Sequence, residues 1–127
     1  MSVGKVIATD MDALAINYDF EEWVGKPPGI YFTGEYQEVE SLNEYGEQET
    51  QFILNGFARG ATAYADLEEA KNKIKKHYPS VGGRLATTES GSRVAIFYAN
   101  ALSNLPTGDA ELKRIQINLK VKEWSVN

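Results

Sequence analysis

Apolar and polar positions alternate most regularly near the end of the chain. The apolar positions there are Ile115, Ile117, Leu119 and Val121. The alternate positions are polar: Gln116, Asn118, Lys120 and Lys122. A period of two is the side-chain repeat of a β-strand. It predicts a strand with one face on a core and the other facing water or a partner.

A different period appears in the middle of the chain, over residues 62–78. Its apolar positions lie three and four residues apart: Leu67, Ala70, Ile74 and Tyr78. This spacing predicts an amphipathic helix with a single apolar stripe. Acidic residues occupy its first half and lysines its second, an order that complements the helix dipole, and Pro79 ends the segment.

Shorter patterns predict the remaining elements. We expect a weak helix over residues 3–13 and strands over residues 13–20, 30–39, 48–59, 84–89 and 93–100. The polar residues 40–47 are expected to form a hairpin connection that projects from the body. The strand at 48–59 carries apolar residues at both odd and even positions, which predicts a central strand or one that faces a neighbouring subunit.

These elements together indicate the α+β class. We expect a single domain over residues 1–127, with an antiparallel or mixed β-sheet, one main amphipathic helix packed on one face and a short N-terminal helix. A chain of 127 residues fits one ordinary domain. It also buries enough surface to need no disulfide or metal for stability.

Composition argues against most catalytic chemistry. The chain has no cysteine and one histidine, and 18 acidic residues against 13 basic ones give a net charge of −5. A catalytic triad would have to use His77, which we interpret as a cation at the end of the predicted helix. With one histidine and no cysteine, only an all-carboxylate metal site remains. We therefore expect no enzyme, no cofactor and no metal, and neither nucleic-acid sequence recognition nor a membrane partner.

Acidic residues concentrate around the predicted hairpin. They are Glu35, Glu38, Glu40, Glu44, Glu47 and Glu49, and Leu42 and Tyr45 lie among them. They fit a solvated loop, a protein contact, or an ion-binding or paired-carboxylate site. If the hairpin is a contact arm, its glutamates pair with the lysines of residues 71–76 on a neighbour. The candidate subunit-interface residues are Glu38, Glu40, Leu42, Glu44, Tyr45, Phe52 and Leu54.

Three stretches carry a resemblance to a known family: residues 26–35 (KPPGIYFTGE), 64–76 (YADLEEAKNKIKK) and 111–119 (ELKRIQINL). With their element order, the chain resembles the tail terminator, or tail-completion, proteins of long-tailed bacteriophages. These are often labelled minor capsid or minor tail proteins in prophages of Gram-positive bacteria. The family usually opens with a longer helix than residues 3–13 provide.

The resemblance implies a structural role in virion assembly. It implies a homo-oligomeric ring that caps the tail tube and joins it to the head connector. Its partners would then be copies of itself, the tail-tube protein and the head-connector protein. It would be found in the host bacterial cytoplasm during assembly and then in the tail or neck of the virion. Another head–tail connector or minor tail component fits the same pattern.

A different class of function is a small-ligand-binding or regulatory α+β module. Five aromatic residues could line its pocket: Trp23, Tyr31, Phe32, Tyr36 and Trp124. Concentration-dependent ring formation would favour an assembly protein. A small molecule that raises the melting temperature of a monomer would favour the binding module.

Overall fold

The computed structural model describes residues 2–21, 25, 29–42, 48–88, 91–103, 105, 107–108 and 111–124, with the backbone alone for residues 2, 37–42, 48–50 and 124. In these residues the elements follow one another as α1 (Ser2–Ala13), β1 (Tyr18–Phe20), β2 (Ile30–Leu42), β3 (Gln48–Arg59), α2 (Ala63–His77), β4 (Arg84–Thr87), β5 (Arg93–Leu102) and β6 (Leu112–Trp124).

The strands form one mixed sheet in the order β1-β2-β3-β6-β5-β4. Strands β1 and β2 run parallel, and every other neighbouring pair runs antiparallel. The last strand in sequence, β6, therefore lies at the centre of the sheet, between β3 and β5. The α+β class and the mixed sheet expected from the sequence are confirmed.

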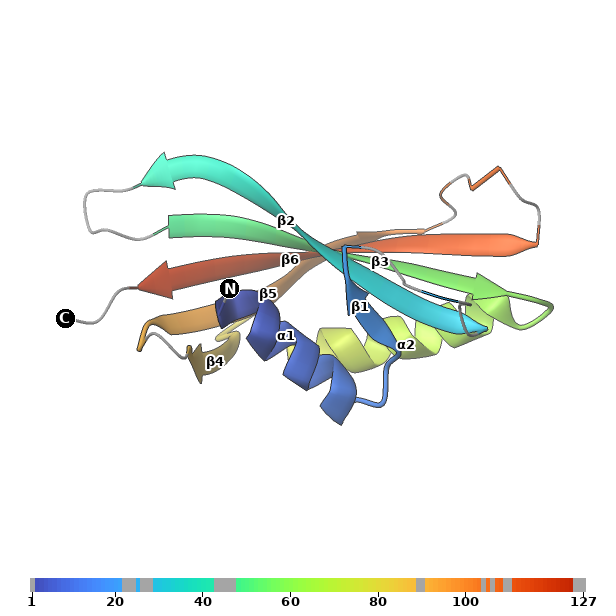
Figure 1. Cartoon of the computed structure of the whole chain (residues 1–127), viewed down its shortest axis with the longest axis horizontal. Helices are drawn as coiled ribbons and strands as arrows, with labels where there is room; N and C mark the ends of the chain where they lie inside the picture. Colours follow the sequence, from blue (N-terminus) through green and yellow to red (C-terminus); the bar gives the residue numbers. More distant parts are fainter. Residues whose placement is uncertain are drawn as a thin grey trace.

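Both helices lie on the same face of the sheet, so the described chain forms two layers (Figure 1). Buried residues of the two helices and of one face of the sheet make a single core. Helix α1 contributes Val3, Ile7 and Met11, which are at most 5% exposed. No helix in the described residues has the length and apolar character needed to cross a membrane.

The two strongest sequence patterns fold as expected. Ile115, Ile117, Leu119 and Val121 of β6 point into the core and are at most 2% exposed. The helix stripe Leu67, Ala70, Ile74 and Tyr78 is buried against them and against β3. Alternation at periods of two and 3.6 thus identified the two surfaces that meet between the layers.

Two predicted boundaries are wrong. The strand expected over residues 13–20 begins only at Tyr18, because the chain leaves α1 through Ala15 in a left-handed conformation with φ of 58°. The hairpin connection expected at 40–47 begins too early, since β2 continues through Leu42 beyond an irregularity in its register after Glu38.

Two glycines allow aromatic side chains to approach the backbone of the strands closely on the core side. A Cβ atom at Gly34 would overlap the Tyr18 hydroxyl and come 2.6 Å from the Phe52 ring. A Cβ atom at Gly56 would overlap the Phe32 ring. Glycine within a strand is explained here by the close approach of a neighbouring side chain.

Candidate assembly surface

The face of the sheet away from the helices is not covered by any described element. Its register places side chains of four strands in transverse rows, such as Tyr31, Phe57 and Arg114, or Thr33, Asn55 and Gln116. Although they lie on this open face, Thr33 and Asn55 are only 7% and 8% exposed. Neighbouring side chains on the open face therefore pack closely over them.

A hydrogen-bonded chain of side chains crosses three strands on this face. The Asn55 amide nitrogen donates to Glu35 Oε1 at 3.3 Å, and Arg114 Nη2 donates to Asn55 Oδ1 at 2.8 Å. Next to it, the Gln116 amide donates to Asn118 Oδ1, and the Asn118 amide donates in turn to Asn100 on β5. These bonds hold polar side chains in fixed positions before any partner binds.

Aromatic groups extend the open face toward the start of β2. The rings of Tyr31 and Phe57 stack with centroids 5.1 Å apart and an interplanar angle of 20°. The Arg114 guanidinium lies over the Phe57 ring at 5.9 Å. Such a surface combines apolar area with oriented polar groups, as the centres of protein interfaces do.

Charge is divided across the strand order of the sheet. Strands β1 and β2 contain four acidic residues, Asp19, Glu35, Glu38 and Glu40, and neither lysine nor arginine. Strands β4, β5 and β6 contain six basic residues, Arg84, Arg93, Lys113, Arg114, Lys120 and Lys122, against the single acid Glu123. Strands β1 and β2 are therefore acidic and the strands from β6 to β4 are basic, with four of the six basic residues on the central strand β6.

The candidate interface residues of the sequence analysis separate into two groups. Glu38, Glu40 and Leu42 lie in β2, where only the backbone is described, and Glu44 and Tyr45 lie outside the described residues. Phe52 and Leu54 must be corrected, because both are 0% exposed in the core beneath β3. Of the two alternatives given for residues 48–59, the structure has the central strand. The side chains of Phe52 and Leu54 are covered by the core and offer no surface to a neighbouring subunit.

A buried cluster that the sequence analysis missed joins both helices to β4. Arg84 Nε donates to Asp10 Oδ2 and Arg84 Nη2 to Asp10 Oδ1, both at 2.8 Å. The Tyr78 hydroxyl donates to Asp10 Oδ2 at 2.8 Å, and His77 Nε2 lies 3.4 Å from the same oxygen. His77 thus lies at the end of α2, as predicted, and it also faces the carboxylate of Asp10.

The electrostatics of this cluster favour a charged Asp10 beside a neutral Tyr78. Burial alone would raise the pKa of Asp10, but the hydrogen bonds from Arg84 and Tyr78 outweigh burial and hold that pKa below its ordinary value. Burial, reinforced by the Asp10 charge, raises the pKa of the Tyr78 hydroxyl. The ion pair and the hydrogen bonds connect α1, the end of α2 and β4, and we interpret the cluster as a clamp between these elements.

Several hollows in the described surface could hold small molecules, and two of them bear on the predicted pocket. One of about 630 Å³ is lined by Leu85, Ala86, Thr87, Arg93 and Val94. Another of about 190 Å³ lies between the end of α1, β2 and α2, and Phe32 is the one predicted pocket aromatic that lines it. Within the described residues, no three His, Cys, Asp or Glu side chains are placed to hold a metal ion.

In comparisons with known proteins, no protein-family model matches the chain and no curated protein matches its sequence.

Proposed function

We propose that this protein is a structural subunit of a bacteriophage or prophage, the tail terminator that forms a homo-oligomeric ring. In this role it caps the tail tube and joins it to the head connector. The observation that carries the proposal is the open face of the sheet, where polar and aromatic side chains are already fixed by contacts with one another.

A surface of this kind suits assembly for a thermodynamic reason. Ordering a mobile side chain at an interface costs roughly 0.5–1.5 kcal/mol. On the open face, Asn55 and Arg114 are held by hydrogen bonds and Tyr31 by ring stacking. Binding a partner would therefore cost little entropy for immobilising these side chains. In the ring, this face would be available to the tail-tube and connector proteins.

The test is the oligomeric state of the purified protein. Native mass spectrometry and light scattering across a range of concentrations should give one closed oligomer, and negative-stain images should contain rings. Adding the ring to assembled tail tubes should stop their elongation. A protein that stays monomeric at all concentrations and leaves tube growth unchanged would overturn the proposal.

The hairpin between β2 and β3 gives a second test of the same role. We propose that Leu42 and Tyr45 are apolar anchors within a charged rim, where large side chains dominate interface energy. The double change Leu42→Ser with Tyr45→Ser should leave the melting temperature unchanged and abolish the higher oligomer. Unfolding of the variant would instead assign these residues to the core.

The small-ligand module is the alternative, favoured by the hollow of about 630 Å³ beside Arg93. Its size falls within the range of ligand pockets. A thermal-shift screen of small anionic compounds against the monomer would reveal it. A saturable rise in melting temperature that Arg93→Ala removes would support this function over assembly.

A further inference from the structure

We propose that copies of this chain join head to tail, with the outer edge of β2 in one copy pairing antiparallel with the outer edge of β5 in the next, over Lys71 and Lys75. This inference rests on the proposed function only in that the protein assembles with itself. A head-to-tail contact requires two different surfaces on one chain that complement each other. The acidic strands β1 and β2 at one edge of the sheet and the lysines of α2 beside β5 at the other edge meet this requirement.

The outer edge of β2 has backbone groups that no described strand pairs with. Strand β1 covers only Phe32, Thr33 and Gly34, where the Phe32 amide donates to Asn17 and the Gly34 carbonyl accepts from Glu21. Backbone groups of every second residue point to the same side of a strand. Those of Tyr36 and Glu38 therefore point outward, past the end of β1.

The outer edge of β5 is covered only in its first part. Strand β4 pairs with residues 93–96, and the connection after α2 satisfies Tyr98, whose amide donates to the Tyr78 carbonyl and whose carbonyl accepts from Ser80. Residues 99–102 continue the strand without a described neighbour on that side.

The two edges have complementary shapes. In β2 and in β5 alike, a short strand covers the first part, and the last residues have no neighbouring strand among the described residues. Because β2 and β5 run in opposite directions, the open half of one strand can pair antiparallel with the open half of the other. Strand β4 of one copy and β1 of the next then lie beyond opposite ends of the new pair, so neither blocks it.

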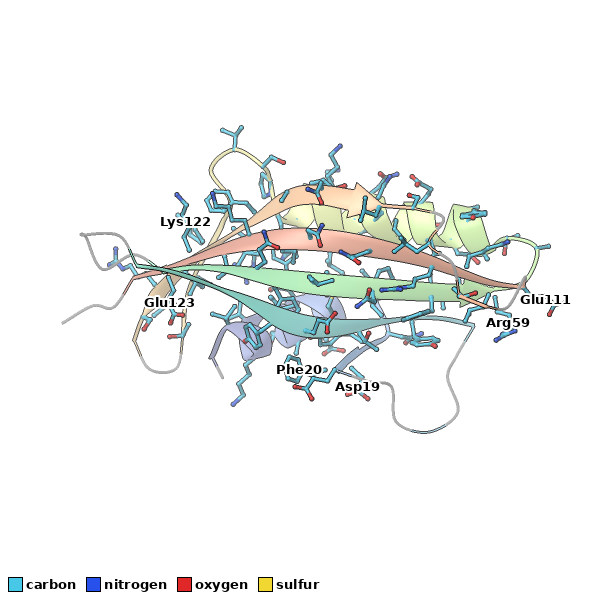
Figure 2. The ribbon with its side chains drawn as sticks, turned by 90° about the horizontal axis from the view of Figure 1, so that it is seen from above. Asp19, Phe20, Arg59, Glu111, Lys122 and Glu123 are labelled. Atoms are coloured by element: carbon cyan, nitrogen blue, oxygen red, sulfur yellow. The ribbon has the colours of Figure 1, made fainter. Side chains whose placement is uncertain are left out.

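Charge on the helices agrees with this pairing. Lys75 Nζ lies 5.5 Å from the centre of the Tyr98 ring, which places this lysine beside β5. Lys71, one turn earlier, bonds Glu68 on the same side of α2. Figure 2 shows α1 on the β2 side of the sheet. Helix α2 packs against β3 and β6, and its end reaches β5. An arriving β2 strand would bring the acidic segment at residues 38–40 of its backbone alongside α2 and its lysines.

Two exposed aromatic rings also lie on the side of the helices. Phe20, at the end of β1, is 42% exposed and packs edge-on against Tyr36, 5.7 Å between centroids. Figure 2 shows it projecting from the β2 side beside Asp19. Tyr64, in the first turn of α2, is 44% exposed and lies under Lys113 of β6. These two rings are suited to anchor the contact between copies.

The experiment exchanges the charges of the two edges. One variant carries Glu38→Lys with Glu40→Lys, and the other carries Lys71→Glu with Lys75→Glu. A control, Asp12→Lys with Glu69→Lys, makes the same change of net charge as the first variant on exposed helix positions. Each variant is measured by light scattering and native mass spectrometry, alone and mixed in equal amounts, and its thermal melt is recorded.

We expect each edge variant alone to lose at least tenfold in self-association, while the control assembles like the wild type. The first variant has two basic edges and the second has two acidic edges, so an equal mixture can alternate them. Mixing should therefore restore assembly, with the two variants in equal numbers. Added salt should weaken the restored contact as it weakens the wild-type contact.

The outcomes separate this inference from the proposed function. A monomeric wild type would overturn the proposed function and the inference together. A wild type that assembles, with both edge variants assembling equally well or with no restoration on mixing, would overturn only the pairing of β2 with β5. If Glu38→Lys with Glu40→Lys fails to fold, the test uses Lys71→Glu with Lys75→Glu and the single change Tyr64→Ser. Normal assembly of both of these variants would overturn the pairing.

Discussion

Asp10 of α1 and Arg84 of β4 form a two-pronged ion pair across 74 residues of sequence, with both nitrogen–oxygen distances at 2.8 Å. The carboxylate also accepts the Tyr78 hydroxyl, so one acidic group connects α1, the end of α2 and the sheet edge. Asp10 is 3% exposed, and removing one member of such a pair leaves a buried group without its partner.

Replacement of Asp10 by asparagine should therefore destabilise the fold by roughly 2–4 kcal/mol, since it removes the charge that Arg84 and Tyr78 bind. Urea unfolding measures the difference. Asp12→Asn is the matched control on the same helix, and its exposed side chain should change stability by less than about 0.5 kcal/mol. Equal effects of the two changes would mean that the clamp contributes nothing.

The same pair should make stability depend on acid. The folded-state pKa of Asp10 lies below its ordinary value of 3.8, so the stabilisation is complete above that value and is lost as pH falls through the folded pKa. Melting curves from pH 6 down to about pH 2 should therefore converge for the wild type and Asp10→Asn. Curves that stay a constant distance apart would contradict the lowered pKa.

Gly56→Ala should destabilise the protein by about 1–3 kcal/mol through overpacking. The new methyl group would overlap the Phe32 ring and approach Ile115, and neither can move far within the core. Gly29→Ala is the control, because a Cβ atom there meets nothing within 4 Å. Chemical denaturation of both variants should show a loss only for the first.

Neighbouring residues of β6 should differ sharply in their effect on stability. Leu119 is 0% exposed, and Leu119→Ala should cost roughly 2–5 kcal/mol through lost burial and a cavity. Lys120 points to the open face, where Lys120→Ala should change monomer stability by less than about 1 kcal/mol. Similar losses from the two changes in thermal melts would contradict the assignment of faces.

The helix α2 and the strand β6 could be predicted because their periodicity is local. The spacing of Leu67 and Ile74 in the helix, and of Ile117 and Leu119 in the strand, shows within a few residues that each pair shares one face. Phe52 and Leu54 could not be assigned in the same way. Strand β3 also carries Ile53 and Phe57 on its other face, and only the positions of the helices decide which set is buried.

The clamp around Asp10 was beyond sequence reasoning for a different reason. The sequence pattern around Asp10 is that of an ordinary exposed aspartate in a weak helix. Its partner Arg84 lies in another element far along the chain. The charge division of the sheet was equally hidden. It appears only once the strand order places β1 and β2 on one side and β5 and β4 on the other. Gly34 and Gly56, by contrast, were a local signal of close packing within strands.

The central position of β6 constrains when the protein can fold during its synthesis. Strands β3 and β5 are both made before β6, yet each pairs with β6 and not with the other. While the chain is still on the ribosome, the β2–β3 hairpin and the β4–β5 pair exist without the strand that joins them. Their inner edges, with unpaired backbone groups, are exposed to other nascent chains until β6 emerges. The two parts of the sheet can therefore join only after β6 has been made, and a chain that stops short of β6 would leave the inner edges of β3 and β5 exposed.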